Sequence, residues 1–190
     1  MLTTKKIELT QILILKTMKT IINFILLLVI LLPTNVKSQQ LSRPDSLLNK
    51  MTGKWILNGT IDNQKTTHDI DIQRVLNGKY VQIKEVSREK DLTGKPLYEA
   101  IVYICWEESK KQYSCLWLDN TSNEGISNGI IGRAKQNTDK IELIFKYNEK
   151  SQFHTTFEYN KETDTWQWLM DGEENGKIQP FARVTLTKNI

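Results

Sequence analysis

The chain has 190 residues, and its 26 Lys and Arg exceed its 22 Asp and Glu by four. Five of the basic residues and one acidic residue lie within residues 1–38, so the remaining 152 residues carry 21 charges of each sign. The positive excess belongs to the first segment, which excludes net charge as an argument for binding nucleic acid. A length of 152 residues suits one domain with a sizeable core.

Residues 1–38 have the composition of an export signal. Lys16 and Lys19 precede an apolar run over residues 21–32, which is the order of a charged and then a hydrophobic region in a signal peptide. The run has 12 residues, which is short for a transmembrane helix, although a retained anchor is the alternative. We therefore expect no stable membrane anchor.

The end of this segment offers a cleavage site. Val36 and Ser38 place small side chains where a signal peptidase requires them, and a complete signal already begins at Met18, which could be the true start. We expect cleavage near Ser38 and a single domain over residues 39–190 in the periplasm or the extracellular space.

From residue 53 onwards, the sequence consists of short runs rich in β-branched and aromatic residues, separated by turn signals. The connections are short, which favours pairing in sequence order. The pattern predicts an all-β fold, an up-and-down antiparallel β-barrel of about ten strands. The expected strands are 53–61, 66–75, 80–88, 97–107, 112–119, 126–134, 140–147, 151–159, 165–174 and 177–187.

A short apolar segment, Leu47, Leu48 and Met51, precedes the first run. Gly53 suits a tight backbone entry, and Trp55 is large enough to fill one end of a barrel. We expect the segment to cap the end that Trp55 fills.

Three hairpins predict which side chains share a face. The turn signals are Asn77-Gly78, a three-residue loop at 148–150, and Asn175-Gly176. Each gives an apolar inner face and a polar outer face. The predicted pairs are Ile72 with Ile83, Arg74 with Val81, Phe145 with Phe153, Leu143 with Thr155, Ile141 with Phe157, Met170 with Phe181, and Trp168 with Arg183.

The motif Gly53-x-Trp55 on the first strand, with Arg183 on the last, resembles the lipocalin and calycin barrels. In those barrels a first-strand Trp packs against an Arg from the end of the chain. Residues 74–81 (RVLNGKYV) and 117–119 (WLD) are similar to an uncharacterised family of secreted bacterial lipocalin-like domains. The resemblance implies that residues 47–187 bind a small hydrophobic molecule, and for the bacterial family it implies no activity.

The hairpin pairs place Arg74 and Arg183 on inward faces. A buried arginine needs a partner. Arg183 either stacks on Trp55 as part of the closure or receives the acidic end of a fatty-acid-like ligand. The predicted cavity residues are Ile72, Arg74, Ile83, Phe145, Phe153, Phe157, Trp166, Trp168, Phe181 and Arg183.

We expect an exported binding protein for a small hydrophobic or amphipathic ligand, with no cofactor and no enzymatic activity. One alternative is an isomerase or cyclase that uses a buried carboxylate, for which Glu85 and Glu99 are the candidates. The other is an interaction module, in which an outward apolar patch of Ile101, Tyr103 and Trp117 meets another protein or a second copy of the chain as a homodimer.

Two motifs with chemical potential have plainer interpretations. Residues 125–129 match the G-x-S-x-G pattern, but no helix follows, so a glycine-rich turn is expected. His68-Asp69-Ile70-Asp71 contains metal-ligand types, but the alternation of a strand sends His68 to one face and both Asp residues to the other. His154 alternates with polar residues and is expected outside, so no metal site is predicted.

Cys105 and Cys115 are the only cysteines, and an even pair in an exported domain suggests a disulfide. The bridge requires an odd-length turn that sets residue 105 opposite residue 115. An even turn would send the two sulfurs to opposite faces.

The export signal yields a direct prediction. The secreted protein should begin at Gln39, because Val36 and Ser38 occupy the small-residue positions before it. N-terminal sequencing of the secreted material checks this, and a start upstream of Leu32 would instead mean a retained anchor.

Overall fold

One helix and ten strands make up the described part of the chain. The computed structural model describes residues 43–189, except 122–125, 127–129, 136 and 138. The predicted export signal therefore lies outside the described residues. The elements are α2 (Arg43–Met51), β1 (Gly53–Ile61), β2 (Gln64–Val75), β3 (Tyr80–Ser87), β4 (Glu99–Glu107), β5 (Gln112–Asp119), β6 (Ile131–Lys135), β7 (Lys140–Lys146), β8 (Ser151–Asn160), β9 (Thr165–Glu174) and β10 (Lys177–Lys188).

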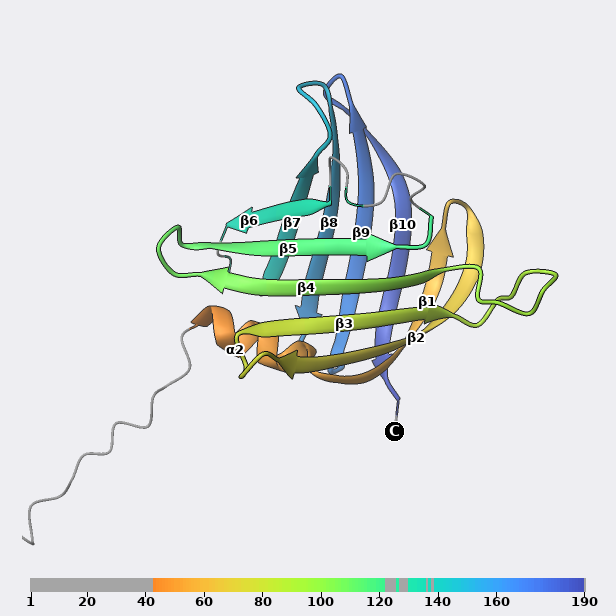
Figure 1. Ribbon diagram of the computed structural model, residues 1–190, viewed down its shortest axis with the longest axis horizontal. Helices are drawn as coiled ribbons and strands as arrows, with labels where there is room; N and C mark the ends of the chain where they lie inside the picture. Colours follow the sequence, from red (N-terminus) through yellow and green to blue (C-terminus); the bar gives the residue numbers. More distant parts are fainter. Residues whose placement is uncertain (1–42, 122–125, 127–129, 136, 138, 190) are drawn as a thin grey trace, which may run out of the picture. The chain divides into compact units, whose positions relative to one another are not determined.

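The strands form one closed antiparallel barrel. Each strand pairs with its neighbour in the sequence, and β10 returns to pair with β1 (Figure 1). The expected all-β, up-and-down barrel of ten strands is confirmed. In Figure 1, β3, β4 and β5 cross β8, β9 and β10 at a steep angle, so two parts of the same sheet face each other across the interior. Among the described residues, no helix is long and apolar enough to span a bilayer.

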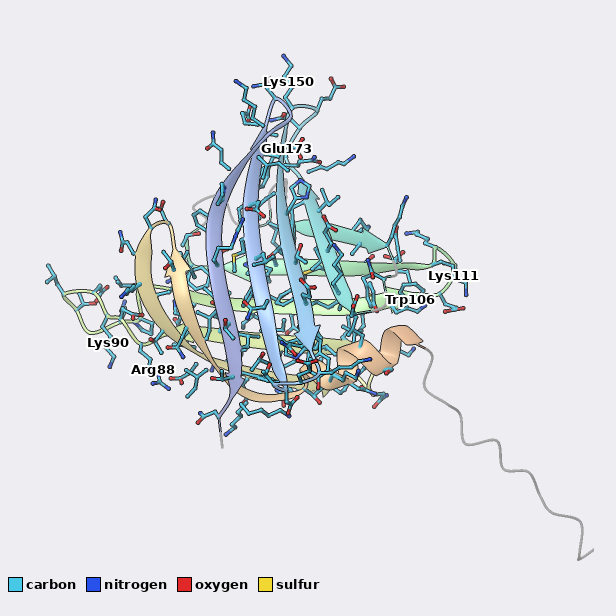
Figure 2. The ribbon with its side chains drawn as sticks, turned by 180° about the vertical axis from the view of Figure 1, so that it is seen from behind. Arg88, Lys90, Trp106, Lys111, Lys150 and Glu173 are labelled. Atoms are coloured by element: carbon cyan, nitrogen blue, oxygen red, sulfur yellow. The ribbon has the colours of Figure 1, made fainter. Side chains whose placement is uncertain are left out.

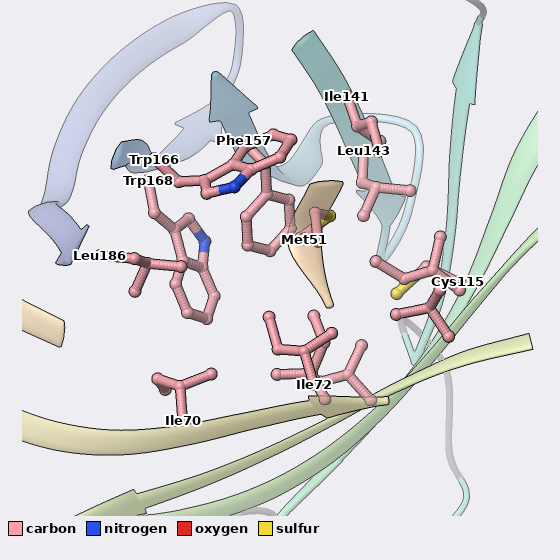
Figure 3. Close-up of a cluster of buried hydrophobic side chains, with 14 of the residues drawn as sticks. Met51, Ile70, Ile72, Cys115, Ile141, Leu143, Phe157, Trp166, Trp168 and Leu186 are labelled. Atoms are coloured by element: carbon pink, nitrogen blue, oxygen red, sulfur yellow. The ribbon is translucent and has the colours of Figure 1, made fainter. Parts of the chain in front are cut away.

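Side chains alternate between the interior and solvent, as the pleat of a strand requires. Apolar side chains from every strand fill one half of the interior. Phe157 and Trp168 pack with their ring centroids 4.6 Å apart, and Trp166 lies 5.0 Å from Tyr159. Figure 3 shows this cluster with Met51, Ile72, Leu143 and Leu186 around it.

Helix α2 closes the same half of the barrel. Leu47, Leu48 and Met51 are buried, and the Nε1 of Trp55 donates a hydrogen bond to the carbonyl oxygen of Met51 at 2.7 Å. Each fully buried Leu or Met side chain contributes about 1.5–3 kcal/mol relative to an exposed one. The expectation that this segment caps the end filled by Trp55 is confirmed.

Two of the three hairpin registers are confirmed. Ile72 lies opposite Ile83 across β2 and β3, and Phe145 lies opposite Phe153 across β7 and β8. At the first turn, Leu76 and Asn77 have φ values of 52° and 57°, which Asn tolerates better than other non-glycine residues.

The third hairpin has the predicted two-residue turn, with Lys177 opposite Glu174, but the predicted pairs of Met170 with Phe181 and Trp168 with Arg183 are wrong because β10 contains a bulge. Pro180 pairs with Asp171 and Ala182 with Met170, which leaves Phe181 without a partner on β9. The extra residue reverses the faces of all residues that follow. Trp168 therefore pairs with Val184 instead of Arg183.

Arg183 consequently lies on the outer surface and does not contact Trp55. Its Nη2 forms an ion pair with Asp171 at 2.5 Å, and its Nη1 donates to the carbonyl of Met170 at 2.9 Å. The end of β10 brings Lys188 to Trp55 instead, with Nζ 4.8 Å from the ring centroid. The predicted arginine–tryptophan contact is corrected to this lysine–tryptophan contact.

The predicted disulfide is also wrong, because β4 and β5 pair one residue away from the register that it requires. Glu107 pairs with Gln112, so the turn between β4 and β5 has an even number of residues. Cys115 then lies opposite Ile104 and is buried, while Cys105 lies opposite Ser114 on the other face. Both cysteines are free thiols, because side chains that point to opposite faces cannot meet the geometry of a bridge.

This register also assigns the faces of β4 and β5. Trp117 pairs with Val102 and points inward, so it is no part of the predicted outer patch. Of the other two patch residues, Ile101 is exposed and Tyr103 is half-buried.

The cysteine arrangement predicts the reactivity of the two thiols. In denatured, unreduced protein a thiol reagent should find two free thiols per chain. In the native protein Cys105 should react first and Cys115 much more slowly, because burial raises the pKa of the Cys115 thiol and shields it.

The matched variant is Cys105→Ser, which should leave only the slow phase. A mass two hydrogens lower in the unreduced chain would contradict the assignment.

Candidate functional site

The half of the barrel opposite α2 encloses a cavity of about 640 Å³. Its rim comes from the connections that follow β1, β3, β5 and β7, through Asp62, Leu97, Thr121 and Tyr147. Figure 2 marks the two ends of the barrel: Arg88 and Lys90 follow β3 on the cavity side, whereas Trp106 and Lys111 lie at the end near α2.

One wall of the cavity is apolar and largely aromatic. Trp117 packs edge-on against Phe145, with ring centroids 6.1 Å apart at 90°, and Phe153 packs edge-on against Phe181 at 5.6 Å. Gly132 lies beneath the ring of Phe145, and a Cβ there would come within 2.7 Å of it. The missing side chain therefore lets this ring lie flat on the sheet.

The opposite wall is polar and comes from β2 and β3. Because the two strands are neighbours and both side chains point inward, His68 and Glu85 meet diagonally across the pair. The Nδ1 of His68 lies 2.5 Å from the Oε1 of Glu85, and the exposed fractions of the two residues are 3% and 1%. Removing either His68 or Glu85 would leave the other buried without its partner, which would cost stability.

A chain of hydrogen bonds continues from this pair toward the rim. The Nε2 of His68 lies 2.8 Å from the Oγ1 of Thr66, which donates to the Oε2 of Glu89 at 2.9 Å. Burial raises the pKa of Glu89, but hydrogen bonds from its own backbone amide, the Thr66 hydroxyl and the Thr67 amide outweigh this and lower it. Glu89 is therefore a carboxylate that accepts the single hydroxyl proton of Thr66.

This chain determines the protons on His68. Since Thr66 gives its proton to Glu89, the hydroxyl oxygen must accept from Nε2, which carries a hydrogen. One further proton then lies between Nδ1 of His68 and Oε1 of Glu85, whichever atom holds it. The His68–Glu85 pair is thus neutral as a unit.

Glu85 is left with one unsatisfied oxygen. Its Oε2 is buried and has no hydrogen-bond partner among the described residues. Burial raises the pKa of Glu85 above its ordinary value of 4.5, and the hydrogen bond with His68 opposes this shift. An unpartnered buried acceptor costs about 1–3 kcal/mol, and Glu85 is one of the residues that line the cavity.

Tyr98 and Asp119 complete the polar side. The Tyr98 ring stacks on His68 with centroids 5.7 Å apart, and its hydroxyl oxygen accepts a hydrogen bond from Nε1 of Trp117 at 3.2 Å. Burial raises the pKa of Tyr98, and the carboxyl groups of Glu85 and Asp119 raise it further. The hydroxyl therefore stays protonated and can donate into the cavity.

The structure places the predicted cavity residues in four locations. Phe145, Phe153 and Phe181 line the cavity. Arg74 lies at the closed end, where its Nε donates to Oδ1 of Asn49 at 2.8 Å, and Arg183 lies outside. The remaining predictions, which belong to the packed core beneath the cavity, are Ile72, Ile83, Phe157, Trp166 and Trp168.

Of the residues that give the cavity its polar character, sequence reasoning singled out only Glu85. Alternation correctly placed His68 on the face opposite Asp69 and Asp71, but His68 was not paired with Glu85. Glu85 was a candidate buried carboxylate, and it is buried, whereas Glu99 is exposed. The signal that could have joined them was the Asn77-Gly78 hairpin, which fixes the register of β2 on β3.

The other chemical motifs do not form sites in the described structure. Most of residues 125–129 lie outside the described residues. His154 lies away from the cavity, with Nε2 2.8 Å from Oε2 of Glu173. Within the described ranges, no three His, Cys, Asp or Glu side chains are grouped to hold a metal ion.

Comparison of the sequence with protein-family models and with curated proteins returns no match. The function must therefore be argued from the cavity itself.

The buried Glu85 predicts a pH-dependent stability. The folded-state pKa of Glu85 is raised above 4.5. The folded protein therefore holds the carboxyl proton of Glu85 more tightly than the unfolded chain does. The stabilisation is present below about pH 4.5 and is lost as the pH rises through the folded-state pKa. The groups that face Glu85 are His68, Tyr98 and Asp119.

The test compares the wild type with Glu85→Gln, which cannot ionise. The Tm of the wild type relative to the variant should fall as the pH rises above about 4.5. Glu99→Gln, which neutralises an exposed carboxylate, should follow the wild type. A Tm difference between wild type and Glu85→Gln that is independent of pH would contradict the assignment.

Proposed function

We propose that the protein binds a small amphipathic molecule in the open half of its barrel. The observation that carries the proposal is the cavity of about 640 Å³, which has an aromatic wall on one side and a buried polar pair on the other. Ligand pockets in proteins commonly measure 300–1,000 Å³ and combine an apolar lining with a few polar groups.

The contrast between the two halves of the barrel supports binding over simple packing. A barrel of this size either fills with side chains or holds one small ligand. Here Trp55, Trp166 and Trp168 fill the half near α2 completely, each with no exposed surface. The other half keeps an open volume although bulky residues line it, as a binding protein requires.

The rim supports entry of an apolar group. Leu97, Tyr147 and Phe181 lie around the mouth with exposed fractions of 56%, 47% and 41%. Exposed apolar side chains that continue into a cavity are typical of ligand entrances.

Export and the lipocalin-like relationship are part of the proposal. The charged and apolar leader supports a role outside the cytoplasm. The closed ten-stranded antiparallel barrel is consistent with a lipocalin-like fold, and such barrels often carry small apolar molecules. A fatty-acid-like ligand was expected because Arg74 and Arg183 were predicted to face the cavity. Neither residue lines the cavity, so that expectation has no support.

An acid–base enzyme is the second candidate, favoured by the free Oε2 of Glu85. A buried carboxyl group in a cavity, with the Tyr98 hydroxyl on the same side, could take a proton from a bound substrate and return it elsewhere. A small molecule that co-purifies with the protein, if extracted and incubated with fresh protein, would separate the candidates, since an enzyme would change the molecule and a binding protein would not. Homodimer formation stays a prediction. The outward patch expected to mediate it no longer includes Trp117.

A neutral fluorescent probe such as N-phenyl-1-naphthylamine tests the binding proposal. The probe should bind once per chain. Phe153→Ala, which removes an aromatic contact with Phe181, should weaken binding roughly 2- to 12-fold.

The matched control is Ile178→Ala, an exposed apolar residue of β10 that does not line the cavity. It should bind the probe like the wild type. Absence of probe binding, or equal losses in the two variants, would overturn the proposal.

A further inference from the structure

We propose that the ligand's polar end is a protonated amine that donates a hydrogen bond to Oε2 of Glu85. This inference rests on the proposed binding function and names the chemical class of the ligand.

The charge of the described cavity lining favours a cation. Four acidic residues line it, Asp62, Glu85, Glu89 and Asp119, against Lys65 and His68. Because one proton is shared within the neutral His68–Glu85 pair, Asp62, Glu89 and Asp119 face only one remaining cation, Lys65. The lining is therefore net negative wherever the shared proton lies. A carboxylate ligand would be repelled, and an ammonium group would be attracted.

The position of the unsatisfied acceptor shows which kind of cation fits. Oε1 of Glu85 is occupied by His68, and Oε2 has no partner among the described side chains and backbone groups. Glu85 lines the cavity, and a small side-chain movement that turns Oε2 toward the cavity would let a ligand N–H satisfy this oxygen. A charge-assisted hydrogen bond is stronger than a neutral one. A quaternary ammonium has the charge but no hydrogen to donate, so a primary or secondary amine fits best.

The aromatic groups beside Glu85 add a second attraction. Tyr98 stacks on His68, and Trp117 donates to the Tyr98 hydroxyl, so two ring systems adjoin the polar wall. Cations are attracted to the faces of such rings. The ligand's apolar part would then lie along Phe145, Phe153 and Met170 on the far wall.

The experiment displaces the neutral probe with four molecules that share a ten-carbon chain: decylamine, decyltrimethylammonium, decanol and decanoate. At neutral pH, decylamine should displace the probe at the lowest concentration and decanoate at the highest, with at least a tenfold difference. Decyltrimethylammonium should be weaker than decylamine because it cannot donate to Oε2.

Two variants assign the effect to named groups. Glu85→Gln should weaken decylamine roughly 10- to 100-fold and remove its advantage over decyltrimethylammonium. Asp119→Asn removes a lining charge without touching the buried pair, so it should weaken both cations by a similar, smaller factor. Glu99→Gln, an exposed carboxylate outside the cavity, is the control and should preserve the order of the four ligands.

Equal displacement by all four molecules, or a preference for decanoate, would overturn the amine assignment while the probe still reports a working cavity. An unchanged preference for decylamine over decyltrimethylammonium in Glu85→Gln would overturn it as well. If the probe itself does not bind, the proposed function fails, and the inference fails with it.

Discussion

The hydrogen bond from Trp55 to the backbone of Met51 seats helix α2 in one end of the barrel. An open-ended barrel has two possible mouths, and this contact closes one of them. Leu47, Leu48 and Met51 then bury their side chains against the tryptophans of β1 and β9. Because buried side chains pack into that half, the cavity of about 640 Å³ lies in the other half of the described barrel.

The packing at the closed end also makes burial of the His68–Glu85 pair energetically costly. His68 and Glu85 lie above the packed core, where water has little access and a charge is expensive. Each satisfies one polar atom of the other, and Thr66 and Glu89 extend the chain toward the rim. Among the described residues, two buried side-chain polar atoms lack a partner, Oε2 of Glu85 and Nε1 of Trp166, and of these two residues Glu85 is the one that lines the cavity. In a barrel whose walls are otherwise paired strands, such an atom points to a ligand or a reacting group rather than to stability.

Irregularities in the strands decide which residues share this interior. The bulge at Phe181 adds one residue to β10, and so Ala182 and Val184 face the core while Arg183 turns outward to Asp171. The even turn after Glu107 likewise turns Cys115 inward and Cys105 outward. Each is a shift of one residue, and in a sheet such a shift exchanges the two faces. The first change removes a positively charged group from the interior, and the second keeps the two thiols apart.

The sequence by itself determined the strand number, the antiparallel order and the faces of β2, β3, β7 and β8. These follow from period-two alternation and from turns such as Asn77-Gly78, which are local properties of the chain. It also identified Glu85 as a carboxylate to inspect and placed His68 on the opposite face from its neighbouring aspartates. The Asn77-Gly78 hairpin also sets the register that brings His68 and Glu85 together, although the pair was not predicted. The tertiary structure alone decided that Lys188 rather than Arg183 covers Trp55 and that the cysteines stay apart. Those outcomes depend on one-residue registers between strands, and a register is set by the packing of the whole closed sheet, which no local pattern encodes.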